Sequence, residues 1–319
     1  MEQVKTDIKH KVSKALKSEI GLLLILILLC TVFAFSSEYF LTGKNLMNVT
    51  RQISIVLIIG IGMLCVVLTG EIDLSVGSSA ALAGIACAAV ITQTGSQTMG
   101  ILAGIGIGTM TGAFNGIMTV YGRIPSFIVT LASMGIFRGI ALVWTQGKPI
   151  SGLPESFSFL GAKYILGIIP ASTIVCSILV LIGFLMIHKT KHGVYIKSIG
   201  ANNEAAVLSA IPINRYKILS FLTVGIMCAI GGIITTSKLL SAQPNACEGM
   251  EMDVLSAVIL GGASLSGGVG TITGTLIGAL TIGVINNGMN LLGVSPFFQQ
   301  IVKGTIILIA VLIKRKEKK

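Results

Sequence analysis

Side chains capable of covalent or metal chemistry are few in this sequence, and they stand apart from one another. The three histidines, His10, His188 and His192, lie in basic stretches, and none has a Ser or Cys nearby that reads as a nucleophile. The six cysteines form no Cys-x-x-Cys or Cys/His spacing of a metal or redox site. We therefore assign no catalytic residue, metal ligand or cofactor to this chain and do not expect it to be an enzyme.

An acidic pair, Glu71 and Asp73, interrupts the boundary between two long apolar stretches. A carboxylate at a membrane boundary is costly unless it is solvated, paired or used as a cap. One interpretation is a boundary cap, in which Asp73 or Ser75 accepts the free N–H groups of the following helix. The alternative is a proton or cation site of an ion-coupled secondary transporter.

Polar groups inside the apolar stretches are the remaining candidates for function. Arg138 is the only basic residue that we place well inside a predicted span, where a charge faces either the bundle interior or a water-filled path. An internal contact with a carbonyl or carboxylate and a place on a solute pathway both stay open for it. Amides likewise bond helix to helix or line a route for hydroxylated solutes. The candidate pathway residues are Asn115, Arg138, Asn286 and Asn287.

Membrane-spanning helices must position these residues. The chain has 319 residues, of which 53% are hydrophobic and 11% charged, and its mean hydropathy is +0.91. A soluble domain carries about 25% charged residues, so the lipid bilayer must be the solvent for most of this surface. We expect an all-α polytopic membrane protein with about ten spans, at 20–36, 52–69, 75–93, 99–121, 125–146, 165–187, 218–239, 252–266, 269–289 and 297–313.

The distribution of the net charge of +11 predicts the topology. Basic tails at 1–19 and 314–319 flank a single transmembrane domain, 20–313, and basic flanks are typical of the cytoplasmic side. The basic loop 188–217 falls on that side in a ten-span count, while Lys44 and Arg51 fall in the first outer loop and do not fit. We expect a multi-pass membrane protein with both termini in the cytoplasm.

Two stretches of the chain resemble each other. Glycines recur every fourth residue in the fourth and ninth spans, and Gly-x-x-Pro-x-Phe follows each of them, at 122–127 and 293–298. A repeat that is offset by five spans must be inverted, which is typical of transporters. The glycine stripes predict close helix packing. These packing residues are Gly104, Gly108, Gly112, Gly116, Gly270, Gly274 and Gly278.

A polar island, residues 200–217, interrupts the apolar sequence. Asn202 is placed to cap a short helix, Glu204 suits the positive N-terminal end of the helix dipole, and Pro212 ends it. Ala205, Leu208 and Ile211 form a narrow apolar stripe. The stripe predicts that the helix rests on the membrane surface or docks into a cytoplasmic partner, and periodicity does not separate the two.

The sequence resembles the ribose-permease-like branch of the sugar permease subunits of bacterial ABC importers, which depend on a binding protein. The stretches 40–52, 62–78, 122–139, 198–217 and 254–280 carry the resemblance. It implies a vitamin-B12-importer-like fold with a five-plus-five inverted repeat. It also implies that the loop 188–217 holds the helix that couples to the ATPase. The coupling residues by this resemblance are Gly200, Ala201, Asn202, Glu204, Ala205, Ala206 and Ser209.

The resemblance also implies the location, which is the bacterial plasma membrane, the partners and the function. We expect a permease subunit for a simple sugar such as ribose that works with a second permease subunit, a tandem-domain ATPase that binds ATP and Mg²⁺, an extracytoplasmic sugar-binding protein and membrane lipid, and not with nucleic acid. The rivals are an ion-coupled secondary transporter of a small polar solute and a membrane-embedded enzyme.

Overall fold

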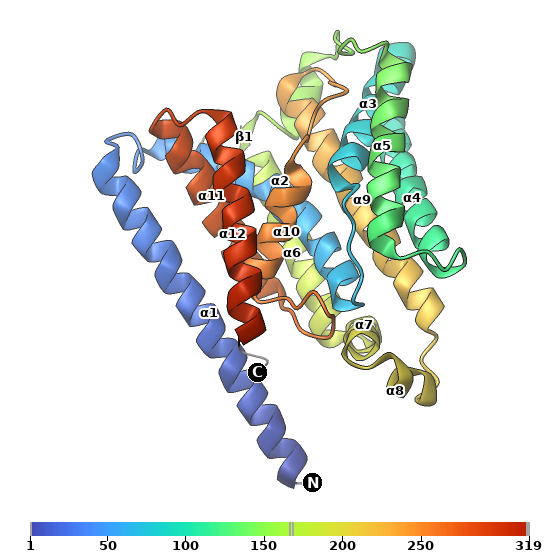
Figure 1. Ribbon diagram of the computed structural model, residues 1–319. Helices are drawn as coiled ribbons and strands as arrows, with labels where there is room; N and C mark the ends of the chain where they lie inside the picture. The colour runs from blue at the N-terminus through green and yellow to red at the C-terminus, as the bar shows by residue number, and fades with distance from the viewer. Residues whose placement is uncertain (1, 166, 168, 317–319) are drawn as a thin grey trace.

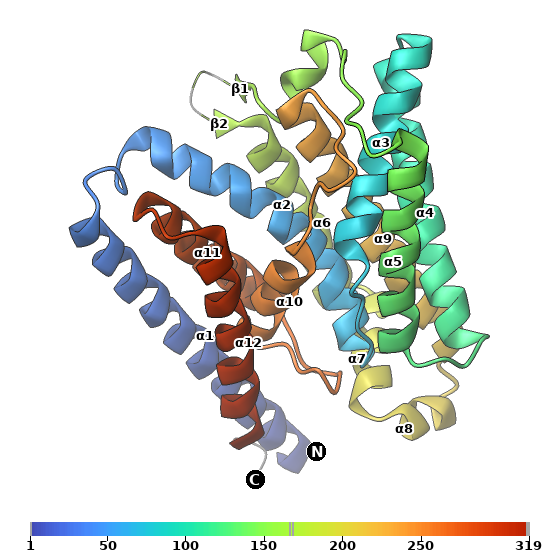
Figure 2. The same cartoon turned by 45° about the horizontal axis from the view of Figure 1, so that its top comes forward.

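The computed structural model describes residues 2–165, 167 and 169–316, with side chains placed for 19–306 and 308 apart from 166 and 168. The basic tails predicted at 1–19 and 314–319 lie almost wholly outside the residues whose side chains are described. The described chain is mostly helical, as Figures 1 and 2 show. Its elements in order are α1 (Glu2–Ser36), α2 (Gly43–Leu68), α3 (Val76–Thr94), α4 (Gln97–Val120), α5 (Ser126–Thr145), η1 (Glu155–Phe159), β1 (Tyr164–Ile165), β2 (Ile169–Pro170), α6 (Ala171–Lys189), α7 (Lys191–Ala201), α8 (Asn203–Leu208), α9 (Ile213–Leu239), α10 (Met250–Leu260), α11 (Ile272–Leu291) and α12 (Pro296–Lys316).

Eight helices in the described part of the chain are long and apolar enough to cross a membrane. They coincide with eight of the ten predicted spans, which agrees with a polytopic all-α membrane protein. The span predicted at 252–266 corresponds to α10, which has only 11 residues. The span predicted at 297–313 lies within α12, where many side chains are outside the described residues.

The start of α2 differs from the prediction. The predicted outer loop that contained Lys44 and Arg51 is helical, because α2 begins at Gly43 instead of residue 52. Thr42 caps this helix by accepting a hydrogen bond from the Asn45 backbone N–H at 3.4 Å. The Arg51 guanidinium lies 4.9 Å from the centre of the Tyr164 ring, a cation–π contact that holds this charge at the end of the bundle.

Two other predicted boundaries are corrected by turns in the backbone. The span predicted from residue 165 begins at Ala171, because β1 and β2 form a small antiparallel hairpin just before it. The helix α10 ends at Leu260, since the chain turns at Gly261 and Gly262 and stays non-helical until α11 begins at Ile272. The eighth predicted span is therefore a short helix followed by an irregular segment.

Two antiparallel helices, α2 and α9, pack against each other at the centre of the bundle. The end of α2 and the start of α9 lie together, because Lys217 of α9 pairs with Glu71, three residues after α2 ends. Figure 1 shows both at the end of the molecule where α7 and α8 lie, with η1 and β1 at the opposite end. Most of α2 is buried, since its side chains face neighbouring helices on all sides in its second half.

The helices around this central pair are exchanged between the two halves of the chain. The first-half helix α2 packs against α10 and α11, while the second-half helix α9 packs against α3 and α4. The pairs α3–α4 and α10–α11, and the pairs α3–α5 and α10–α12, are also in contact. The two halves thus repeat one packing pattern around an antiparallel pair.

The glycine stripes lie where backbones approach closely. A Cβ added at Gly108 would meet the Gly225 carbonyl oxygen of α9, and one at Gly112 would meet the Phe221 carbonyl oxygen. In the second half, a Cβ at Gly278 would meet the Ala257 carbonyl oxygen of α10. Only glycine allows these approaches, so the helices touch through their backbones.

Two extended segments, residues 69–75 and 240–249, lead into α3 and α10. Residues 69–75 run back along the bundle from the end of α2 (Figure 1), and residues 240–249 follow α9 in the same way. The start of α3 meets the segment 240–249 and the start of α10, because a Cβ added at Gly77, in the first turn of α3, would lie 2.7 Å from the Glu251 Oε2 atom and against the Cys247 carbonyl oxygen. The helices α3 and α10 therefore begin next to each other, inside the molecule.

Candidate functional site

The polar island folds into two helices, α7 and α8, that meet at Asn202. The Asn202 side chain caps α8 by accepting a hydrogen bond from the Ala205 N–H at 3.0 Å. The helix ends at Leu208, earlier than the stop predicted at Pro212. The reason is that Ala210 adopts a left-handed conformation with φ of 55°, and Pro212 directly precedes α9. Gly200 and Ala201 consequently belong to α7 and not to the helix of Glu204.

The apolar side chains of α8 face away from the rest of the chain. Leu208 is 89% exposed and Val207 is 60% exposed, whereas Ala206 is buried. Ala205 of the predicted apolar stripe is also exposed. No hydrogen bond or ion pair of the Glu204 side chain is found among the described residues. This helix therefore offers a small apolar surface and one free carboxylate outside the bundle.

The glycine at position 200 joins this surface to the bundle. A Cβ at Gly200 would collide with the Leu68 carbonyl oxygen at the end of α2 and with the Gly267 and Gly268 backbone. The Gly268 N–H donates to the same Leu68 oxygen at 3.0 Å. The helix α7 is thus seated directly on the end of α2 and on the irregular segment before α11. Any displacement of α8 and α7 reaches both.

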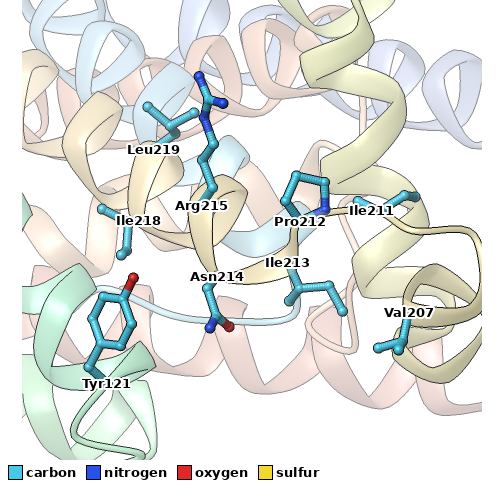
Figure 3. Close-up of a pocket in the computed structure, with 9 residues that line it drawn as sticks. All are labelled: Tyr121, Val207, Ile211, Pro212, Ile213, Asn214, Arg215, Ile218 and Leu219. Atoms are coloured by element: carbon cyan, nitrogen blue, oxygen red, sulfur yellow. The ribbon is translucent and has the colours of Figure 1, made fainter.

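A groove adjoins α8. It is a cavity of about 620 Å³ between the end of α4, α8 and the start of α9. Figure 3 shows Tyr121 on one side, facing Asn214 and Ile218, and Val207 of α8 on the other. Exposed basic residues surround this end of the molecule, among them Arg123, Lys189, Lys191 and Arg215. The groove and α8 form one continuous, basic-rimmed surface.

Both acids of the segment between α2 and α3, Glu71 and Asp73, form polar contacts with other side chains. Glu71 Oε1 pairs with the Lys217 ammonium group of α9. Asp73 is 2% exposed, and its Oδ1 atom accepts hydrogen bonds from the Ser75 N–H at 2.8 Å and the Ser75 hydroxyl at 2.7 Å. Ser75 stands at the N-cap position of α3, but its side chain bonds no helix N–H, because its hydroxyl is turned toward Asp73. The predicted cap at Ser75 is corrected in this respect.

The three predicted pathway amides form hydrogen bonds with other parts of the bundle. The Asn115 amide donates to Asp73 Oδ2 at 3.2 Å and to the Ser75 hydroxyl at 2.8 Å. The Asn287 side chain exchanges two hydrogen bonds with Asn45 of α2, at 2.9 and 2.8 Å. The Asn286 amide lies 3.4 Å from Asp253 Oδ2. These contacts tie α4 to the segment before α3, and α11 to α2 and α10.

Arg138 of α5 contacts backbone carbonyls of the second half. Its Nη1 atom donates to the Pro244 oxygen and, at 3.0 Å, to the Ala246 oxygen. Both acceptors lie in the segment 240–249. The side chain is half-buried.

One charged pair was missed from the sequence. Lys303 lies inside α12 and pairs with Asp253 of α10 at 2.8 Å, so Arg138 is not the only basic residue inside the predicted spans. The partners are 50 residues apart, and no local spacing signals them. The only indication was a lysine flanked by apolar residues.

The chain was then compared with known proteins. A family described as "Branched-chain amino acid transport system / permease component" matches residues 45–311. The ribose import permease protein of Bacillus subtilis strain 168 is 43% identical over 319 residues, covering 99% of this chain and 98% of that protein.

Two further relatives are similar over most of their length. The ribose import permease protein of Escherichia coli K12 is 40% identical over 301 residues, 93% of each chain. An L-arabinose ABC transporter permease protein of Azospirillum brasilense is 36% identical over 293 residues, 92% of this chain and 86% of that protein. No solved structure matches the chain.

Proposed function

The chain belongs to the branched-chain amino acid transport system permease family, and from this premise we propose that it is the permease subunit of an ATP-driven ABC importer for a simple sugar such as ribose. The similarity to the ribose import permeases extends over nearly the whole of both chains and carries this proposal. The chain itself forms no covalent bond with the solute, and ATP with Mg²⁺ belongs to the partner ATPase.

The coupling surface is α8 with the residues that seat it. Gly200, Ala201, Asn202, Glu204, Ala205, Ala206 and Ser209 are the proposed coupling residues. The exposed apolar side chains of α8 and the free Glu204 carboxylate suit a cleft in a cytoplasmic protein better than a bundle interior. An amphipathic helix of this kind gains binding free energy by placing its apolar side in a groove.

Motion of α8 has a direct route into the bundle. Gly200 sits on the end of α2 and on the segment 261–271, so a push on α8 acts on the central helix pair. Transport then requires only that the ATPase bind two arrangements of this pair with different affinity, which shifts the population between outward and inward access.

The topology completes the proposal. We assign ten spans, with the short α10 as the eighth, and an inverted five-plus-five repeat of the vitamin-B12-importer type. The exchanged packing around the antiparallel α2 and α9 supports this. The basic surface around α7 and α8 favours the cytoplasmic side for that end and for both termini.

The partners follow from the same assignment. They are a second permease subunit, a tandem-domain ATPase and an extracytoplasmic sugar-binding protein. Placement of Asn115, Arg138, Asn286 and Asn287 on the solute pathway stays a prediction. The alternative, a secondary transporter, requires an acid that is free for ion coupling. Glu71 pairs with Lys217, and Asp73 accepts hydrogen bonds from Ser75 and Asn115, which argues against that alternative.

Reconstitution tests the proposed function. Vesicles that contain the chain, the ATPase and the binding protein are expected to accumulate radiolabelled ribose only when ATP is supplied, with no loss of uptake when an uncoupler is added. Vesicles with the chain alone serve as the control. Accumulation by the chain alone, or uptake abolished by the uncoupler, would contradict the proposal.

A further inference from the structure

The helix α5 is bonded to both extended segments that lead into the buried helix starts. Near its beginning, the Ser126 hydroxyl accepts a hydrogen bond from the Ile72 N–H at 3.2 Å. One turn later, the Thr130 hydroxyl lies 3.3 Å from the Ile72 carbonyl oxygen, which shares this donor with the Ser126 carbonyl oxygen at 2.8 Å. The segment 69–75 of the first half is therefore held to α5 through the backbone of Ile72.

The second half's segment, 240–249, is held by the same helix two to three turns further along. Arg138 donates from one guanidinium nitrogen to the Pro244 and Ala246 carbonyl oxygens. Pro244 is buried, so its carbonyl has little access to water. A buried carbonyl without a donor is costly, and a charged donor bonds it about twice as strongly as a neutral one.

The segment that Arg138 holds has an unusual backbone. Leu240 and Cys247 adopt left-handed conformations, with φ of 47° and 58°, although neither is glycine. Residues other than glycine adopt such conformations only where surrounding contacts enforce them. The Cys247 carbonyl is also pressed against Gly77 at the start of α3. The segment is thus clamped between α3 on one side and α5 on the other.

We propose that Arg138 is a positioning residue that fixes the segment 240–249 to α5, so that both segments leading into α3 and α10 move together with α5. This role does not need Arg138 to touch the solute. The guanidinium matters because its rigid plane directs the two hydrogens of Nη1 to two carbonyls at once, whereas an ammonium group is a point charge on a flexible stem.

Hydrogen exchange measured by mass spectrometry tests the positioning role without any transport assay. The Ala246 N–H within the segment bonds Gln243 O at 3.0 Å, and the N–H of Met250, the first residue of α10, bonds the Cys247 O of the segment at 3.2 Å. In Arg138→Met we expect these amides to exchange about tenfold faster, while peptides covering 69–75 stay unchanged. Arg138→Lys is expected to give about a threefold increase, because one of two bonds is kept.

Two further variants complete this experiment: one is a control for the loss of a positive charge, and the other removes the contacts of α5 with the segment 69–75. Lys148→Gln removes an exposed positive charge near the same end of the molecule and should leave both segments unchanged. Ser126→Ala with Thr130→Val should accelerate exchange in 69–75 and leave 240–249 protected. Equal exchange of 240–249 in wild type and Arg138→Met overturns the proposal, and if the Met variant does not assemble, the Lys variant decides in the same way.

Uptake measurements add the functional consequence, which rests on the proposed function. With the ATPase and binding protein present, Arg138→Met should lower the maximal rate of ribose uptake about tenfold at an unchanged half-saturating concentration, as expected for loss of a conformational step. A raised half-saturating concentration at an unchanged maximal rate would place Arg138 on the solute and overturn the positioning role. If wild type takes up no ribose, the proposed function fails, and hydrogen exchange alone decides whether Arg138 fixes the segment.

Discussion

At the scale of single residues, the charges of this protein are used as structural ties. Glu71 pairs with Lys217, and Asp253 pairs with Lys303. Asp73 has no ion-pair partner among the described residues and instead accepts hydrogen bonds from Ser75 and Asn115. The two ion pairs and the bond from Asn115 to Asp73 join elements that are distant in the sequence, so they stabilise the packing of the bundle.

The pair Glu71–Lys217 predicts a double-mutant result. The side chains are 15% and 21% exposed, so each single change, Glu71→Gln or Lys217→Met, leaves a partly buried charge alone and is expected to cost about 1–3 kcal/mol of unfolding free energy. The double variant should lose less than the sum. Thermal unfolding in detergent measures all four proteins, and simple additivity would show that the charges do not interact.

The half-buried His192 predicts a pH dependence. It lies in α7, outside the proposed spans, and burial lowers the pKa of its imidazole below the ordinary value of 6.5. The unfolded chain then binds more protons than the folded one between the two pKa values, so stability falls as the pH drops below 6.5. His192→Gln should flatten this part of the thermal-unfolding profile, while Lys191→Gln should not. An unchanged profile in His192→Gln would contradict the assignment.

At the scale of elements, short polar signals predicted the helix ends better than hydropathy did. Asn202 caps α8 as expected, because Asn followed by strong helix formers is a local signal. The start of α2 was predicted nine residues late, because Lys44 and Arg51 read as a loop. The end of α8 was predicted late, because the left-handed turn at Ala210 has no sequence signature.

The exposed surface of α8 predicts a separation of stability from coupling. Leu208→Asp, Ala205→Asp or Glu204→Ala should leave expression and thermal unfolding unchanged, because these side chains are exposed. ATP-driven uptake should fall about tenfold or more if each change costs over about 1.4 kcal/mol of docking. Co-purification of the ATPase with the chain measures the docking. Ala206→Asp, at the buried neighbour, is the contrasting variant and should destabilise the chain.

The backbone contact between α4 and α9 predicts that two glycines of α4 respond to substitution differently from a third. Gly112→Leu places a side chain against the Phe221 carbonyl, and Gly108→Leu does so against Gly225, at a cost on the order of 3 kcal/mol. Gly106 has no atom within 4 Å of the added Cβ, so Gly106→Leu should be tolerated. Size-exclusion profiles and unfolding temperatures compare the three. Normal assembly of Gly108→Leu and Gly112→Leu would show that the helices do not need this contact.

At the scale of the whole molecule, hydropathy predicted an all-helical membrane bundle, and the glycine stripes predicted where the helices touch. Most side-chain hydrogen bonds and ion pairs between helices could not be predicted from the sequence. The contacts between Asn45 and Asn287 and between Asp253 and Lys303 join residues that are 242 and 50 positions apart. A single sequence, read without an alignment, contains no signal for such pairing. The Arg138 contact was one of two open interpretations.

The placement of α7 and α8 predicts the labelling of introduced cysteines in intact cells. Glu204→Cys should react with a membrane-impermeant maleimide only after the cells are opened, and Lys148→Cys should react from outside. Both positions are exposed. Four of the six native cysteines are buried and the other two, Cys30 and Cys247, are partly buried, so the protein without an introduced cysteine gives the background. The reverse pattern would show that the assigned orientation is wrong.

The exchange of helices between the halves has a consequence for biosynthesis. When α1 to α5 leave the ribosome, α2 has already entered the membrane, yet α10 and α11, which cover much of it, do not exist. Until the C-terminal half is synthesised, the surface of α2 that packs against α10 and α11 is exposed to lipid. A chain truncated after residue 160 therefore lacks the packing partners of α2, and we expect quality-control proteases to degrade it. Co-expression of the C-terminal half should restore its stability.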